Sequence, residues 1–423
     1  MTTITNKFLR VANRVPGVLY EPAQKSPKQK VAVLVMHSDE DYLSFPTGPE
    51  LAKRGYTVLC ANVAGKEGII FTQIEKMKNV KAAILLLRSL PGIEKIILMG
   101  HSGGGTLMSA YQAVAENGPK IFQGDDKIYP YPDDEELPPA DGIMLLDSNW
   151  GNAAMQLFSL DPAIEDENDG KMINPELDLH DPRNGFDPSG TTYSDEFMVR
   201  YQEAQSVRNN GILEFALSRL LELESGNGHY SDDEPLVLPG SAQGFFNNKL
   251  YAQDVRLMAH TQKPRALIHP DGSITTEIVH SLRGPENPVS FTPSFWEGAR
   301  FLSIRTYLSS YAVRTEDDYG FDEDHVWGID WHSSYSCPVA NMEYVHCPTL
   351  VMGMTAGWEF LASETIFEHA AAEDKTIAFV EGATHKFDTA KHMEQYPGQY
   401  GDTCTTLHNY VDKWLEKTFP VWK

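Results

Sequence analysis

Apolar, strand-like runs alternate with helical patterns over the first 150 residues of the chain. Continuous apolar segments rich in β-branched residues lie at 31–36, 56–61 and 142–147, and their length is typical of buried strands. Residues 73–90 instead place apolar side chains three and four positions apart, which predicts an amphipathic helix. This alternation predicts a mostly parallel sheet, because a helix commonly carries the chain back between parallel strands.

Both ends of the chain extend this pattern. Two short segments at 8–12 and 17–20 flank Val15-Pro16-Gly17 and predict an opening hairpin. Near the C-terminus, the alternation returns as a strand, a helix, a second strand and a closing amphipathic helix, at 348–354, 363–373, 376–380 and 405–417 respectively. The C-terminal part is therefore expected to complete the sheet that the first part begins.

The segment from about residue 151 to residue 345 lacks this alternation. It carries helical patterns at 194–224, interrupted at Asn209-Asn210-Gly211, and a hairpin pattern at 266–279 around an Asp-Gly turn. We predict a core formed by 1–150 and 346–423, with 151–345 inserted as a largely helical lid. Such a lid would cover the carboxyl edge of the sheet and shape a substrate pocket.

Composition and charge narrow the range of partners. The chain has 423 residues, of which 41% are hydrophobic and 22% charged, as in an ordinary globular protein. Its formal net charge of −24 disfavours nucleic acid and anionic membrane surfaces, because both would repel it. Highly anionic substrates are mildly disfavoured for the same reason. The expected partner is an apolar or weakly polar small-molecule substrate. The acidic residues gather in three segments that predict solvated loops, at 125–126, 133–136 and 161–169.

Cysteine usage and the N-terminal sequence predict a cytoplasmic protein. Four cysteines in a chain of this length do not form a disulfide framework, and the absence of a C-x-x-C motif argues against zinc. Cys337 and Cys347 could pair, but free thiols are the expected state. The first 15 residues lack the apolar core of a signal peptide, and no run approaches the length of a membrane span.

The segment Gly100-His101-Ser102-Gly103-Gly104 matches the motif G-x-S-x-G. A strand pattern at 93–99 precedes it and a helical pattern at 105–114 follows it. Strand, sharp turn and helix form the context that a nucleophile elbow requires. The glycines let strand and helix approach closely while the serine takes a strained backbone conformation. Ser102 is therefore the candidate nucleophile.

Four segments together resemble the α/β-hydrolase superfamily, in the order in which that family places them. They are 35–37, 51–56, the motif at 100–104 and Glu381-Gly382-Ala383-Thr384-His385. The resemblance covers about residues 1–150 and 346–423 and leaves the middle uncovered. It implies a mostly parallel eight-stranded sheet with helices on both faces and a cap inserted after the sixth strand.

The resemblance also implies where the catalytic base and its acid partner lie. The base would be His385, which follows the last strand. The commonest position of the acid, a few residues past the seventh strand, holds Gly357 here. Asp147 at the end of the sixth strand is the favoured acid, Glu359 lies two residues past the usual place, and Glu364 is a weaker third candidate.

A developing oxyanion needs two preorganised donors. The first is expected to be the backbone N–H of Gly103, directly after the nucleophile. The resemblance implies that the second comes from the loop after residues 31–36, where His37-Ser38-Asp39 stands in place of the family's His-Gly-x. Asp39 or Ser38 is therefore the candidate donor, and His37 is predicted to be a structural hydrogen-bonding residue rather than a second base.

These features predict a serine hydrolase that cleaves a carboxylic ester, lactone or thioester through an acyl-enzyme on Ser102, without metal or organic cofactor. The same triad would also suit a carbon–carbon bond hydrolase or an acyltransferase, and a chain that kept the pocket but lost turnover would be a non-catalytic binding protein. An aromatic-rich lid could support a homodimer. Six aromatic residues could line its pocket, although packing within the lid is their commoner role: Trp150, Phe295, Trp296, Phe301, Tyr307 and Tyr311.

Overall fold

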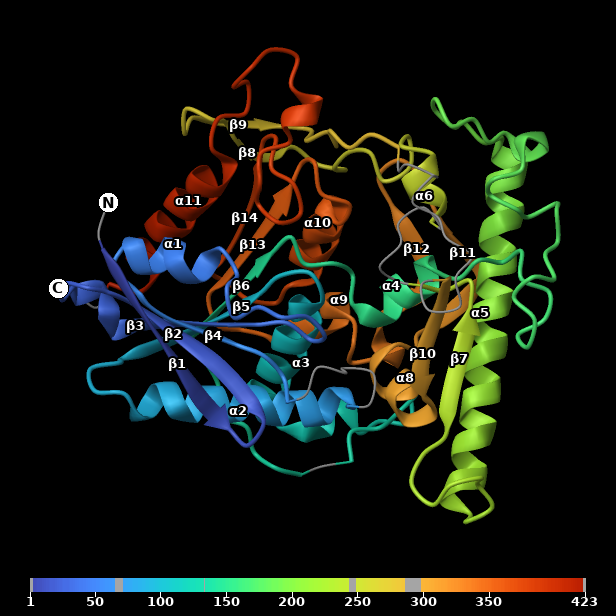
Figure 1. Cartoon of the computed structure of the whole chain (residues 1–423), viewed down its shortest axis with the longest axis horizontal. Coiled ribbons are helices and arrows are strands. Elements are labelled where there is room, and N and C mark those ends of the chain that lie inside the picture. Colours follow the sequence, from blue (N-terminus) through green and yellow to red (C-terminus); the bar gives the residue numbers. More distant parts are fainter. Residues whose placement is uncertain (1–2, 65–70, 133, 243–248, 286–297, 421–423) are drawn as a thin grey trace.

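One ten-stranded sheet organises the molecule (Figure 1). The computed structural model describes residues 3–64, 71–132, 134–242, 249–285 and 298–420, so Phe295 and Trp296 lie outside the described residues. The strand order is β1-β2-β4-β3-β5-β6-β13-β14-β8-β9. The strands are β1 Ile4–Ala12, β2 Val15–Pro22, β3 Val31–Met36, β4 Thr57–Ala61, β5 Lys95–Gly100, β6 Gly142–Leu146, β8 Arg265–Ile268, β9 Ile274–Glu277, β13 Thr349–Met354 and β14 Lys375–Val380.

The centre of the sheet is parallel and its two ends are antiparallel. The seven central strands, β4-β3-β5-β6-β13-β14-β8, pair in parallel. The outer strands β1, β2 and β9 pair antiparallel with their neighbours. The carboxyl ends of the parallel strands therefore open onto one edge. Every candidate site residue follows a parallel strand at that edge, which is where ligands bind in open α/β sheets.

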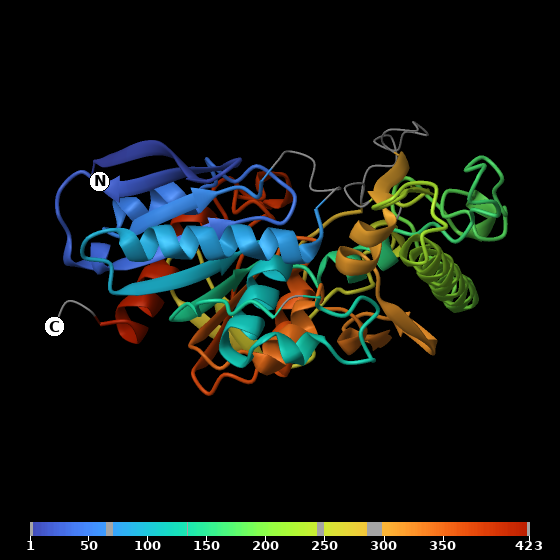
Figure 2. The ribbon, with the colours of Figure 1, turned by 90° about the horizontal axis from the view of Figure 1, so that it is seen from below.

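Helices cover both faces of the sheet, as the sequence predicts (Figures 1 and 2). The sequence of β3 is apolar throughout because its successive side chains pack into cores on opposite faces of the sheet. Ala32, Leu34 and Met36 join the core beneath one set of helices, while Val31 and Val33 join the core on the opposite face. The first set is α2 Gln73–Ser89, α3 Gly103–Asn117 and α10 Phe360–His369, and the second is α1 Thr47–Lys53 and α11 Thr403–Thr418.

Residues 151–345, called the middle segment below, lie largely at one side of the sheet, with the long helix α5 outermost (Figure 1). Besides β8 and β9, the segment forms two small antiparallel sheets, one of β7 with β10 and one of β11 with β12. Its described elements are α4 Asn152–Phe158, α5 Asp195–Glu224, β7 Pro235–Pro239, α6 Leu250–Gln253, β10 Ala299–Ser303, α8 Ile304–Ser310, β11 Arg314–Phe321, β12 Val326–Asp330 and α9 Pro338–Asn341. Three of the aromatic residues considered for a pocket are almost completely buried, as expected for core residues. Tyr307 and Tyr311 belong to the middle segment, and Trp150 directly precedes it.

The sheet has ten strands rather than the expected eight. The predicted hairpin at 266–279 is present as β8 and β9, but it extends the central sheet through parallel pairing of β8 with β14. The pairs Phe379↔Leu267 and Val380↔Ile268 form this join. The sequence signals a hairpin through its turn and alternation, but these local features do not reveal which edge the hairpin joins.

The helical break expected at Asn209-Asn210-Gly211 is wrong, because α5 runs without interruption for 30 residues. Both asparagines bind the segment around β11 instead of ending the helix. The side-chain amide of Asn209 donates to the carbonyl of Val313 at 2.9 Å. Asn210 donates to the carbonyl of Thr315 at 3.0 Å and accepts its N–H at 3.2 Å. These tertiary hydrogen bonds outweigh the weak helix propensity of the three residues.

Gly211 gives a direct test of this helix. It is exposed, and a Cβ built on it would meet nothing within 4 Å. We expect Gly211→Ala to raise the free energy of unfolding by about 0.5–1 kcal/mol, because alanine loses less backbone entropy in a helix. Urea unfolding followed by circular dichroism measures the change, and a lower stability would contradict a continuous helix at this position.

The described part of the chain contains no helix that is both long and apolar enough to cross a membrane. All four cysteines have free thiols, as predicted, and Cys60 and Cys337 are buried.

Candidate active site

The sharp turn predicted around Ser102 is present between β5 and α3. Ser102 has φ 53° and ψ −130°, a strained conformation for a residue other than glycine. The surrounding glycines are required by close packing. A Cβ on Gly100 would lie 2.7 Å from the Cα of Gly105, and one on Gly104 would lie 2.6 Å from the carbonyl oxygen of Met36. The half-buried Ser102 is thus held at the carboxyl edge of the sheet.

His385 follows β14 at the same edge and meets two carboxylates. Its Nδ1 lies 2.7 Å from Oδ2 of Asp147 and 3.2 Å from Oε2 of Glu359. The single Nδ1–H can point at only one of them, and it bonds Asp147, which leaves the buried Oε2 of Glu359 without a hydrogen bond. The structure therefore brings both leading acid candidates to His385. Glu364 lies elsewhere and binds Arg265 at 2.7 Å.

Asp147 connects three parts of this edge. Its carbonyl accepts the N–H of Ser102 at 3.1 Å, while its Oδ1 accepts the N–H of Met354 at 2.8 Å. Its φ of 50° turns the chain sharply at the end of β6. Gly357, which replaces the commonest acid, leaves the space that the Asp147 carboxylate fills, since a Cβ there would lie 2.6 Å from Oδ2.

The two carboxylates control the protonation of His385. Burial alone would lower the pKa of His385, but the charge of Glu359 and the hydrogen bond and charge of Asp147 raise this pKa to about 9. Burial in turn raises the pKa of both Asp147 and Glu359 above their ordinary values. Asp147 keeps its charge more readily of the two, because its carboxylate accepts two hydrogen bonds.

His101, the variable residue of the motif, ties the elbow to the loop of His385. Its Nε2 bonds the carbonyl of His385 at 2.6 Å, which makes Nε2 the donor and Nδ1 the acceptor from the hydroxyl of Tyr42. The two imidazole rings lie 4.3 Å apart, and Phe45 and Phe387 pack against the ring of His101. Burial holds the pKa of His101 well below its ordinary value, so the ring is neutral. The motif leaves this position variable, so no sequence pattern identifies the roles of His101 or Tyr42.

The loop after β3 differs from its predicted role. Gly103 opens α3, so its N–H has no acceptor within the helix and remains suited to an oxyanion. The N–H of Asp39, the expected second donor, instead donates to Nδ1 of His37 at 3.0 Å. The N–H of Glu40 donates to the same nitrogen at 2.9 Å. Asp39 is therefore not an available donor in this arrangement, whereas the structural role expected for His37 is present.

The Asp39 carboxylate joins the core to the middle segment. It accepts hydrogen bonds from Lys76 on α2 at 2.8 Å, from the Tyr311 hydroxyl at 2.9 Å and from the Asn152 amide at 3.2 Å. Lys76 is completely buried. The nearby cations, first of all Lys76, hold the pKa of Asp39 well below its ordinary range despite burial. Asn152 also donates to the hydroxyl of Ser38 at 3.0 Å.

Asp147, Glu359 and His385 are also the described residues that come closest to a metal-ligand set, since their ligand atoms lie within 4.8 Å of one another. A cation bound by Nδ1 would replace the proton that now bonds Asp147. Metal binding and the hydrogen-bonded arrangement of these residues therefore exclude each other.

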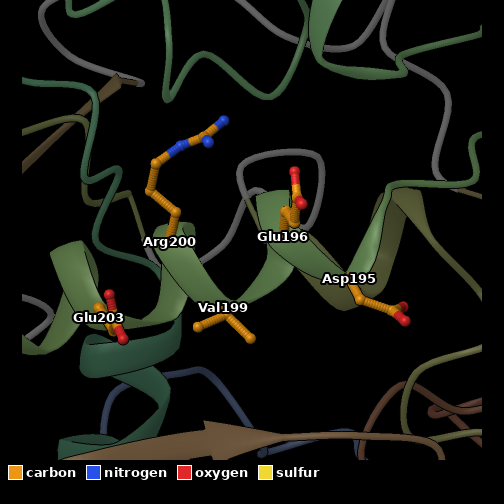
Figure 3. A pocket seen from close by; sticks show the side chains of 5 residues that line it. All are labelled: Asp195, Glu196, Val199, Arg200 and Glu203. Carbon is orange, nitrogen blue, oxygen red and sulfur yellow. The ribbon is translucent and has the colours of Figure 1, made fainter.

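A hollow of about 580 Å³ lies away from this edge, on the first half of α5. The side chains that line it point in different directions rather than toward a common centre (Figure 3): Asp195, Glu196, Val199, Arg200 and Glu203. The hollow therefore offers no convergent chemistry, and the candidate site is the edge that carries Ser102 and His385.

No protein-family model and no curated protein matches the chain. Several solved structures are similar to it at low identity. The siderophore hydrolase EstB from Aspergillus fumigatus has a TM-score of 0.45 and 11% identity, with 99% of this chain and 98% of that chain covered. A soluble variant of monoglyceride lipase from Saccharomyces cerevisiae has a TM-score of 0.44 and 11% identity, with 99% and 96% covered. The α/β hydrolase GrgF from Penicillium sp. sh18 has a TM-score of 0.42 and 12% identity, with 99% of both chains covered. Such distant likenesses support no conclusion about activity.

The ion pair of Lys76 and Asp39 can be tested through stability. We expect Asp39→Asn to lower the free energy of unfolding by about 3 kcal/mol, because it leaves the Lys76 ammonium buried without its counter-charge. The double variant Asp39→Asn, Lys76→Met removes both charges and is expected to recover part of this loss. Urea unfolding of the three proteins measures both effects. Equal stability of the wild type and Asp39→Asn would contradict a pair in which Asp39 neutralises the buried Lys76.

Proposed function

We propose that this chain, an α/β-hydrolase in fold, is a serine hydrolase that cleaves a carboxylic ester, lactone or thioester. The observation that carries the proposal is the position of Asp147. Its backbone carbonyl holds the strained Ser102, while its carboxylate holds His385. A nucleophile on an elbow, a histidine and an acid that fixes the histidine are the three parts of a hydrolytic triad.

In the proposed reaction, Nε2 of His385 takes the proton of Ser102 as Oγ attacks the carbonyl carbon of the substrate. The carbonyl π electrons move to oxygen, and the Gly103 N–H stabilises the resulting oxyanion. The intermediate collapses, the bond to the leaving group breaks, and His385 gives its proton to that group. Water attacks the acyl-enzyme in the same way, with His385 again as base, and releases the acid and Ser102.

Asp147 acts as the triad acid in this proposal, and Glu359 adjusts the histidine. Asp147 accepts the Nδ1–H at 2.7 Å, so it sets the tautomer that leaves Nε2 free to accept a proton. Oε2 of Glu359 lies nearby without a hydrogen bond, and in its ionised form Glu359 acts through its charge, which raises the pKa of His385. The roles of the two acids are therefore separable by experiment.

The middle segment is proposed to act as a lid. Two of its residues reach the loop after β3, since Tyr311 binds Asp39 and Asn152 binds Ser38 and Asp39. A segment in contact with the loop beside the nucleophile is placed to border the space into which a substrate enters.

The first test is covalent labelling with a fluorophosphonate probe. We expect wild type to be labelled, Ser102→Ala to show no labelling, and His385→Ala to react at least about 10²-fold more slowly, because the serine loses its base. Intact protein mass and thermal unfolding of both variants provide the controls. A folded wild type that neither reacts with the probe nor hydrolyses p-nitrophenyl esters would overturn the proposed function.

The second test separates the two acids through the pH dependence of kcat/KM. Because the pKa of His385 is raised to about 9, its neutral form increases as the pH rises, and activity is expected to rise from neutral pH toward about 9. Glu359→Gln removes a negative charge, so we expect the ascending limb to move to lower pH by about one unit. Asp147→Asn removes the acceptor that fixes the tautomer and is expected to lower kcat by about 10⁴-fold. If Glu359→Gln caused the larger loss, the assignment of the acid would be reversed.

A further inference from the structure

The loop after β3 contains an unpartnered donor beside the nucleophile. Nδ1 of His37 accepts the N–H groups of both Asp39 and Glu40. A ring nitrogen that accepts such hydrogen bonds carries no proton, so the proton of the neutral ring is on Nε2. No hydrogen bond to that Nε2 is present among the described residues, although His37 is only 6% exposed. Nε2 itself is not completely buried, so its N–H is accessible to a bound group.

The ring of His37 lies against the residue that supplies the first oxyanion donor. Its Cε1 is 3.1 Å from the position where a Cβ on Gly103 would stand. Cε1 is bonded to both ring nitrogens, so Nε2 lies one bond from an atom placed beside Gly103. The imidazole of His37 therefore lies beside Gly103, the residue that directly follows the nucleophile.

The ring is also held rigidly. Two backbone hydrogen bonds fix Nδ1, and the ring stacks on Tyr42 with centroids 4.7 Å apart and planes 25° apart. Burial lowers the pKa of His37 to about 4, despite the opposing charges of Asp39 and Glu40. The ring is therefore neutral at neutral pH and keeps one defined tautomer, as a preorganised donor should.

We propose that the side chain of His37 is a catalytic residue, whose Nε2–H is the second donor of the oxyanion hole. This inference rests on the proposed function. The His37 side chain thus has the role that was expected for the backbone N–H of Asp39. That N–H is not available, because it donates to Nδ1 of His37. The site thus uses one imidazole twice: Nδ1 orders the loop, and Nε2 faces the developing charge.

Two substitutions separate these roles. His37→Asn places an amide oxygen where Nδ1 stands, so it can still accept the loop N–H groups, but it has no atom at the Nε2 position. His37→Gln places an amide nitrogen at the Nε2 position and has no acceptor in place of Nδ1. We expect His37→Asn to lower kcat by about 10²–10³-fold with little change in KM, the usual effect of losing one oxyanion donor. His37→Gln is expected to lose less activity.

A trifluoromethyl ketone inhibitor gives a readout that a purely structural role would not change. Addition of Ser102 to its carbonyl forms a hemiketal with an oxyanion, so its inhibition constant should rise in His37→Asn by a factor similar to the loss in kcat/KM for a p-nitrophenyl ester. Thermal unfolding and circular dichroism of both variants check that the loop and fold are retained.

The outcomes distinguish the inference from the proposed function. An active wild type with unchanged kcat and inhibitor affinity in a folded His37→Asn would overturn the role of His37 alone. A loss in His37→Gln as large as that in His37→Asn would also overturn it, since the loop tether would then account for the effect. A wild type that neither reacts with the fluorophosphonate nor hydrolyses esters would overturn the proposed function itself.

Discussion

The arrangement of the site depends on the sharp backbone turn at Asp147, directly after β6. At the end of β6 its φ of 50° turns the chain, so that its carbonyl meets the N–H of Ser102 while its carboxylate points at His385. Its own N–H donates to the carbonyl of Met352 at 2.6 Å. One residue therefore fixes the elbow, the neighbouring strand β13 and the histidine loop together. Its carboxylate can take this position because Gly357 has no side chain to occupy it.

Burial of charge shapes the rest of the edge, and the two acids near His385 show how. Asp147 has hydrogen bonds on both oxygens, whereas Oε2 of Glu359 has none. Burial raises the pKa of Glu359, and its Oε2 lacks a hydrogen bond, so Glu359 takes up a proton more readily than Asp147 as the pH falls. A neutral Glu359 raises the pKa of His385 less than an ionised one does. The protonation of Glu359 and the basicity of His385 are therefore linked, as in other coupled sites.

The sequence predicted the core and the ends of its strands because these depend on local patterns. Continuous apolar runs marked β3, β5 and β6, and the motif around Ser102 marked the elbow, since its glycines are required by backbone contacts. The choice between Asp147 and Glu359 could not be made from sequence. Both follow neighbouring strands, and only the three-dimensional direction of the Nδ1–H distinguishes them.

The errors arose where tertiary contacts override local signals. Asn209 and Asn210 are poor helix formers, yet their amides bind the backbone of Val313 and Thr315. The hairpin of β8 and β9 was recognisable, but not its pairing with β14. The position of Asp39 along the chain predicts that its N–H is an oxyanion donor, whereas this N–H donates to the side chain of His37, two residues earlier. In each case the missing information was the identity of a partner, not the type of element.

The loop after β3 is bound both by the core and by the middle segment, and these contacts restrict its movement. On the core side, His37 accepts two of its N–H groups and Lys76 binds the Asp39 carboxylate. On the other side, Tyr311 and Asn152 of the middle segment bind the same carboxylate. A displacement of the middle segment would remove partners from a carboxylate that still has to neutralise a buried lysine. The hydrogen bonds from Tyr311 and Asn152 therefore oppose such movement and help to hold the loop in one conformation. A donor carried by this loop would need no reorganisation when charge develops beside it, which is the condition under which an oxyanion hole is most effective.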